Sequence, residues 1–177
     1  MNTHTHTLMV DLIRVSTANV FSTMLDVDLP PGEAFIENGT PESNDGVVSF
    51  IGVAGAWAGT GSISCSPGVA CRICSLMLMA ESAGVDEDVL DAVAELTNMI
   101  VGSVKNDLET HLGPLGLSIP TVVFGKNFKT KSAGTTDWTV VRFPWDGEAL
   151  TVKMCLSPSE KSHLNCHMMG QTCALDV

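Results

Sequence analysis

The apolar and polar positions between residues 86 and 113 follow the period of a helix. Three- and four-residue spacings place one apolar set on a single face: Val89, Val93, Leu96, Ile100 and Val104. The opposite face carries a polar stripe, which consists of Asp91, Glu95, Asn98, Gly102 and Lys105. Asp86 fits an N-cap, and Gly113-Pro114 marks the predicted end. The pattern therefore predicts a long surface helix with one buried face and one presented face.

The segments before this helix predict two more helices and two strands. Helical spacing of apolar residues predicts helices over residues 8–25 and 70–82, the second ending near Gly84. Segments rich in strand-forming residues predict strands over residues 47–57 and 60–66, with a turn region at Gly59. Residues 30–45 are rich in Pro, Gly and acidic residues, so we expect an exposed connection there.

The segments after this helix predict three strands. One runs from Pro120 through Phe124, and residues 138–144 and 149–156 form a hairpin that turns at Asp146-Gly147. Helices that flank mostly antiparallel strands predict an α+β fold, an α/β sandwich. A chain of 177 residues, 45% of them hydrophobic, is long enough for one substantial core. We expect a flexible N-terminus over residues 1–7, one domain over 8–156 and a tail over 157–177 that need not be ordered.

Charge and hydropathy exclude two classes of partner. The formal charge is −11 with an isoelectric point near 4.6, and the basic residues are scattered, which argues against nucleic-acid binding. No segment approaches ~20 uninterrupted apolar residues, and the first residues lack the blocks of a secretory signal. We therefore expect a cytoplasmic protein with no membrane insertion.

The cysteines raise the alternative of a zinc or redox site. Cys71 and Cys74 form a CxxC pair within an apolar stretch, where small buried thiols pack well. A zinc ribbon would need a second CxxC pair, and the sequence has none. Four more His and Cys residues lie near the end of the chain, and we interpret them as solvated tail residues and not as ligands: His163, Cys166, His167 and Cys173. The pattern favours reduced thiols, and no metal site is predicted in this chain.

The composition of the polar stripe suggests more than solvation. Solvated helix faces are common, and the stripe could be one of them. However, Asn98 and Gly102 each cost roughly 0.5–1 kcal/mol relative to Ala in a helix interior. Glu95 and Asn98 project side by side, so a carboxylate and an amide could engage one partner together. Asn98 cannot act as a general base, and Gly102 would let a partner's backbone come close.

The spacing of these residues resembles a known family signature. Asp91, Glu95 and Asn98, with Pro120 twenty-two positions after the Asn, resemble the signature of the CheC, CheX and FliY phosphatases of bacterial chemotaxis. The segment Ala94-Glu95-Leu96-Thr97-Asn98-Met99-Ile100-Val101-Gly102 and the later Leu117-Ser118-Ile119-Pro120-Thr121-Val122 are both similar to CheX. The resemblance extends from about residue 8 to about residue 156, and it implies the CheC-like fold with the signature on a long surface helix.

The resemblance also implies a reaction and a partner. The substrate would be the aspartyl phosphate of a CheY-like receiver, so hydrolysis would terminate a chemotaxis-type two-component signal. Glu95 would pair with a receiver lysine, and Asn98 would orient the attacking water. Asp91 would support docking, and Lys105 could attract the acidic receiver pocket or simply be solvated. The Mg²⁺ would belong to the receiver, so no cofactor is expected in this chain.

The first helix indicates one active surface per chain. CheC members carry the signature in each of two similar halves, but here Asn19 is preceded by Ser16 where the pattern needs Glu. This favours the CheX type, which implies a homodimer that associates through its sheets. Two alternatives stay open: a non-catalytic module that binds the receiver, and a structural subunit of a larger assembly. The second ranks last because the sequence predicts no extra domain of the FliY kind.

Overall fold

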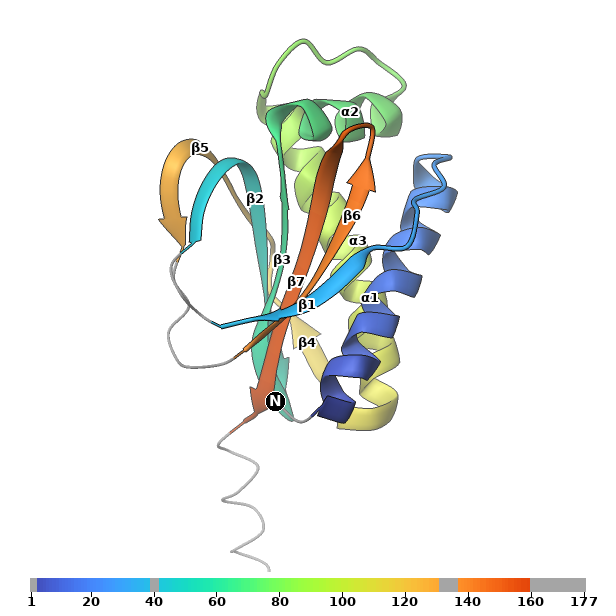
Figure 1. Ribbon diagram of the computed structural model, residues 1–177, viewed down its shortest axis with the longest axis vertical. Coiled ribbons are helices and arrows are strands. Elements are labelled where there is room, and N and C mark those ends of the chain that lie inside the picture. Colours follow the sequence, from blue (N-terminus) through green and yellow to red (C-terminus); the bar gives the residue numbers. More distant parts are fainter. Residues whose placement is uncertain (1–2, 39–41, 131–136, 160–177) are drawn as a thin grey trace, which may run out of the picture.

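A computed structural model describes residues 3–38, 42–130 and 137–159, which form three helices and seven strands (Figure 1). The elements in chain order are α1 (Thr3–Met24), β1 (Glu33–Glu37), β2 (Glu42–Gly55), β3 (Trp57–Cys65), α2 (Pro67–Leu78), α3 (Glu87–Leu112), β4 (Leu115–Leu117), β5 (Thr121–Thr130), β6 (Trp138–Trp145) and β7 (Glu148–Pro158). The strands form one sheet in the order β1-β6-β7-β3-β2-β4, and β5 also pairs with β2. Every pairing is antiparallel, which confirms the predicted α+β class.

The helices form a second layer against the sheet. In Figure 1, α1 and α3 run side by side, and α2 lies across one end of the strands. Helix α3 contacts β2, β3, β4 and β5, while α1 contacts α3 and β6. The apolar set predicted for the buried face of α3 is fully buried: Val89, Val93, Leu96, Ile100 and Val104. Burial of this face against the sheet and α1 fixes which side of α3 remains exposed.

The predicted caps of α3 are confirmed. Asp86 Oδ1 accepts a hydrogen bond from Val89 N at 3.0 Å, so the N-cap satisfies one of the free amides of the first turn. At the other end, Gly113 has a φ of 82° and donates its N–H to Glu109 O. A positive φ favours glycine, which explains why the helix ends there.

Helix α1 begins earlier than the sequence predicts. It starts at Thr3, so the expectation of a flexible segment over residues 1–7 is wrong for residues 3–7. Thr and His are weak helix formers, and their local preference gives no helix signal. A hydrogen bond of 2.9 Å between His6 Nδ1 and Thr139 Oγ1 joins this first part of α1 to β6. A contact 133 positions away in sequence therefore supports the extra turns.

The expected connection over residues 30–45 is also wrong. Strand β1 lies within it and pairs with β6, from Glu33 opposite Arg142 to Glu37 opposite Trp138, and β2 already begins at Glu42. Charged residues suggested a loop, but they are equally typical of an edge strand. The Arg14 guanidinium of α1 donates to Gly32 O through Nε at 3.1 Å and through a terminal nitrogen at 2.6 Å, which anchors the start of β1.

The turn between β2 and β3 lies at Ala56, directly after Gly55, whose φ is 151°, and not at Gly59. Gly59 lies inside β3, opposite Val53 on one side and Leu156 on the other. A Cβ at Gly59 would overlap Cys155 O, so this glycine permits a close approach of strands. The sequence predicted a turn at Gly59 because glycine is common in turns. The close packing of Gly59 against β7 depends on residues far away in sequence, so the local pattern could not show it.

The boundaries of the remaining elements agree with the sequence prediction only in part. Helix α2 begins after the N-cap Ser66 and ends at Leu78, because the φ of 52° at the C-cap Met79 stops the helix before the predicted end near Gly84. The hairpin turn at Asp146-Gly147 is confirmed, with φ values of 49° and 81°. Strand β4 was not predicted, and β5 continues well beyond Phe124. Strand β7 reaches Pro158, and the rest of the predicted tail, residues 160–177 with its His and Cys residues, lies outside the described residues.

The N-cap of α3 gives a test of the fold. Asp86→Ala should lower the free energy of unfolding by about 1 kcal/mol because it leaves the Val89 amide without its acceptor. Asp86→Asn should stay close to wild type, since Asn caps as well as Asp. Urea denaturation measures both variants. Equal stability of the Ala and Asn variants would contradict the capping role.

Candidate functional site

The polar stripe of α3 borders a hollow of about 450 Å³. We call it the α3 hollow, and its lining comes from α3 and from the connection between β4 and β5: Asp91, Ala94, Glu95, Asn98, Ser118, Ile119 and Pro120. The signature residues thus lie together, including Pro120, which is far from Asn98 in sequence. The hollow is large enough to receive several side chains of a partner protein.

Local helical geometry places three candidate side chains at this hollow. Asp91, Glu95 and Asn98 follow one another at intervals of four and three residues, so they share one face of α3. All three side chains are exposed. Four of the residues between them are buried: Ala92, Val93, Leu96 and Thr97. Among the residues that the structure describes, no hydrogen bond or ion pair engages the side chain of Glu95 or of Asn98. Their polar groups therefore face the hollow without an internal partner.

The opposite wall of the hollow depends on strand pairing. Strands β4 and β5 both pair with β2: Leu117 lies opposite Val53, and Thr121 lies opposite Phe50. The short connection between β4 and β5 is therefore held along β2 and beside α3. The sequence around Pro120 contributes to the predicted signature, but it predicts no role for Ser118 or Ile119. The exposure of Ile119 and the place of both residues at the hollow follow only from the folded chain.

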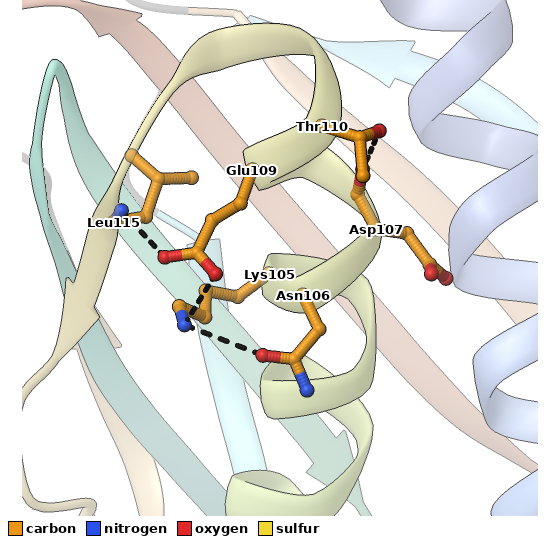
Figure 2. Close-up of polar contacts among 6 residues, drawn as sticks. All are labelled: Lys105, Asn106, Asp107, Glu109, Thr110 and Leu115. Atoms are coloured by element: carbon orange, nitrogen blue, oxygen red, sulfur yellow. Dashed lines mark hydrogen bonds and ion pairs between the residues drawn. The ribbon is translucent and has the colours of Figure 1, made fainter.

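The other two residues of the polar stripe lie outside the hollow. At Gly102, an added Cβ would lie 3.8 Å from Leu117 Cδ1, an ordinary contact distance. The Lys105 ammonium lies 2.9 Å from Glu109 Oε2 and donates to Asn106 Oδ1 at 3.3 Å (Figure 2). Lys105 is therefore held by its own helix, and its predicted partner-binding role stays a prediction, as does that of Gly102.

Glu109 joins α3 to the strand that follows it. Its Oε1 accepts a hydrogen bond from Leu115 N at 2.8 Å while Oε2 pairs with Lys105, as Figure 2 shows. The hydrogen bonds from Lys105 and from the Leu115 amide lower the pKa of Glu109, because both favour the charged carboxylate. This arrangement fixes the turn from which β4 runs back toward the hollow.

Burial raises the pKa of three of the described cysteines: Cys65, Cys71 and Cys155. Cys65, Cys71, Cys74 and Cys155 are free thiols. Burial, together with the nearby Glu148 charge, raises the pKa of Cys65 to about 12. Burial is also the main cause of the raised pKa of Cys71. Thiols with raised pKa values are weak nucleophiles and weak metal ligands at neutral pH. Among the described residues, no group of three or more His, Cys, Asp and Glu side chains could hold a metal ion.

Over the ranges 3–38, 42–130 and 137–159, no helix combines the length and apolar character needed to cross a bilayer.

Comparison with known proteins identifies relatives of this chain. The family model described as "Chemotaxis phosphatase CheX" matches residues 47–143, more than half of the sequence. The Thermotoga maritima protein named "CheY-P phosphatase CheX" is 38% identical over 90 residues. These residues cover 50% of this chain and 57% of that relative, so the match spans little more than half the length of the relative.

Solved structures share the fold over a larger part of the chain. A CheC-like superfamily protein from Shewanella sp. PV-4 matches with a TM-score of 0.76 and 27% identity, over 89% of this chain and 99% of its own. CheX in the CheX-CheY-BeF3-Mg²⁺ complex from Borrelia burgdorferi matches with a TM-score of 0.69 and 23% identity, over 84% of this chain and 97% of its own. At 23% identity, the similarity to the Borrelia burgdorferi protein shows a shared fold.

The lowered pKa of Glu109 predicts a pH-dependent contribution to stability. This contribution is complete above the ordinary Glu pKa of 4.5 and is lost as pH falls through the lower pKa of the folded state. Glu109→Gln should therefore be less stable than wild type at neutral pH, with a difference that shrinks as pH falls below 4.5. Urea denaturation at several pH values measures it. Asp107→Asn, an exposed carboxylate on the same helix, is the control and should not show this trend.

Gly102 gives a second test, in which stability and function should move in opposite directions. Gly102→Ala should raise the free energy of unfolding by roughly 0.5–1 kcal/mol, because a helix interior favours Ala and the added Cβ has room beside Leu117. Thermal denaturation measures the change. If Gly102 also serves close docking, the same variant should bind the partner more weakly. Unchanged partner affinity in a stabilised variant would limit this glycine to a structural role.

Proposed function

Because the chain belongs to the CheX family of chemotaxis phosphatases, we propose that it hydrolyses the aspartyl phosphate of a CheY-like receiver. Such a reaction would terminate a chemotaxis-type two-component signal. The observation that carries the proposal is the α3 hollow, where the carboxylate of Glu95 and the amide of Asn98 face outward beside Pro120. A carboxylate and an amide in this arrangement suit docking on a cation and ordering of a water molecule.

The relatives support the proposed substrate and partner. The Thermotoga maritima relative is named for action on CheY-P. The Borrelia burgdorferi relative was crystallised with CheY, BeF3 and Mg²⁺. In the proposal, the Mg²⁺ ion belongs to the receiver, and this chain contributes side chains only. The chain would act in the cytoplasm, where it meets its receiver.

The proposed reaction needs little chemistry from this chain. An acyl phosphate is already activated, and the receiver with its Mg²⁺ neutralises the phosphoryl charge. Water attacks phosphorus in line, the bond from phosphorus to the aspartate oxygen breaks, and the products are inorganic phosphate and the free aspartate. Asn98 accepts a hydrogen bond from the attacking water and holds it on the line of attack. Its amide is uncharged, so it adds no repulsion next to the phosphoryl oxygens.

The neighbouring side chains would position the receiver. Glu95 lies one turn before Asn98 and would pair with the receiver lysine, so docking and water placement come from one helix face. Asp91 lies a further turn away on the same hollow and would support docking. Gly102 would let the receiver backbone approach at the other end of the stripe. Lys105 would contribute only if its ammonium left Glu109, which makes it the weakest member of the predicted set.

The homodimer formed through the sheets, which the family resemblance implies, stays a prediction, and sedimentation equilibrium measures it directly. The competing hypothesis for function is a non-catalytic module that binds the receiver without hydrolysing its phosphate. Both alternatives for function use the same exposed acidic face, and only the amide of Asn98 separates them.

Asn98→Ala gives the decisive test. The variant should lower turnover by about two to three orders of magnitude, because one positioned polar group is lost at the reacting atoms. The measurement is the decay of Mg²⁺-loaded, phosphorylated receiver at substoichiometric amounts of this protein. Receiver affinity should change little, since the docking surface is retained.

Matched variants distinguish the possible outcomes. Glu95→Ala should weaken receiver binding as well as turnover, and Asp107→Asn, on a distant part of α3, should behave as wild type. An unchanged rate for Asn98→Ala would exclude the catalytic assignment. Receiver binding without any acceleration by wild type would support the docking module.

A further inference from the structure

Ile119 is an apolar side chain placed where a polar surface would be expected. It is 86% exposed, although it lines the α3 hollow together with Asn98 and Glu95. Single exposed apolar residues are common on protein surfaces. Ile119 differs from others such as Met79, which is also almost fully exposed, because it shares a hollow with the proposed catalytic residues.

The connection that carries Ile119 is an interruption in the strand ladder. Between the pairs Val53–Leu117 and Phe50–Thr121, β2 contributes two residues, and the facing chain contributes three, Ser118, Ile119 and Pro120. One extra residue on one strand is the arrangement of a β-bulge. Bulges bend the strand locally and change the direction of a side chain, and they occur often beside active sites.

Ser118 makes three hydrogen bonds in this bulge, two of them to β2. Its backbone N–H donates to Gly52 O at 2.9 Å, and its Oγ accepts from Gly52 N at 2.8 Å. The same hydroxyl donates to Ile119 O at 2.9 Å. A Cβ on Gly52 would lie 3.3 Å from Ser118 Oγ, so the glycine allows this close approach. The hydroxyl thus joins β2 to the backbone of the residue that projects into the hollow.

Pro120 restricts the same residue from the other side. A residue before proline is confined to extended backbone conformations, because the proline ring clashes with its helical ones. Ser118 and Pro120 together hold the Ile119 backbone in place. A side chain that is already positioned loses little conformational entropy on binding, which increases its contribution to affinity.

We propose that Ile119 is an apolar docking contact for the receiver, and that Ser118 is the positioning residue that presents it. This inference rests on the proposed function. Asn98 and Ile119 line the same hollow, so a receiver surface that admits Asn98 to the phosphorylation site also covers Ile119. The receiver must therefore present an apolar patch at the rim of that site. Glu95 supplies charge recognition from one wall, and Ile119 supplies apolar contact from the other.

Steady-state kinetics on phosphorylated, Mg²⁺-loaded receiver from the same genome test the role of Ile119. Ile119→Ala should raise KM about tenfold and leave kcat within about twofold, because it removes binding without touching the reacting atoms. Ile36→Ala is the matched control, since Ile36 is 50% exposed on β1, at the other end of the strand order from β4. A KM for Ile119→Ala that matches the Ile36→Ala control would overturn the proposal.

A double-mutant cycle tests Ser118. Ser118→Ala should raise KM roughly fivefold, and Ser118→Thr, which keeps the hydroxyl, should restore it. Combined with Ile119→Ala, Ser118→Ala should add little, because Ser118 acts through Ile119. Full additivity of the two effects on KM would exclude the positioning role. Melting temperatures of all variants identify any loss that comes from the fold alone.

Direct binding separates this inference from the proposed function. Titration with BeF3-activated, Mg²⁺-loaded receiver measures affinity without hydrolysis. If wild type binds but does not accelerate decay, the proposed phosphatase function fails, and the affinity of Ile119→Ala still decides the docking contact. If wild type accelerates decay and Ile119→Ala binds as tightly as wild type, only the docking contact fails.

Discussion

The pairing of β2 with two successive strands is the constraint on which the candidate site depends. β2 pairs with β3 along one edge, and along its other edge it pairs first with β4 and then with β5. This places the three-residue connection between β4 and β5 beside α3. Without that pairing, Pro120 and Ile119 would follow α3 in sequence but would have no reason to face Asn98.

The two faces of helix α3 have different roles: the apolar face packs in the core, and the polar stripe is presented to solvent. Its apolar face is fully buried, so packing against the sheet and α1 supplies most of the stability that a long helix needs. This makes the helix tolerant of poor helix formers on the exposed face, where Asn98 and Gly102 lie. The exposed face can therefore carry residues that suit contact with a partner, even where they are poor helix formers. The Lys105–Glu109 ion pair and the Glu109 bond to Leu115 then fix where the chain turns back toward the hollow.

The two walls of the hollow are held by independent means. Asn98 and Glu95 project from a helix whose position is set by its core, and Ile119 projects from a bulge that Ser118 joins to β2. Neither wall needs to move to form the site. In the proposed function, the receiver would already contain its metal ion and an activated phosphoryl group, so it would need only a fixed surface that supplies one aligned amide. The same rigidity would let docking contacts distinguish among related receivers without altering the reaction.

The sequence alone determined the features that depend on neighbours along the chain. Asp86, the apolar period and Gly113 predicted α3 with its two faces, and Asp146-Gly147 predicted the hairpin, because caps, periods and turns are local. Tertiary structure decided what depends on distant residues. The early start of α1, the strand β1 and the place of Gly59 inside β3 all follow from contacts with β6 or β7. The opposite wall of the hollow likewise depends on β2, which lies more than sixty positions before Ser118. Pairing over such a distance leaves no periodic signal within the segment itself, so only the folded chain could reveal Ser118 and Ile119.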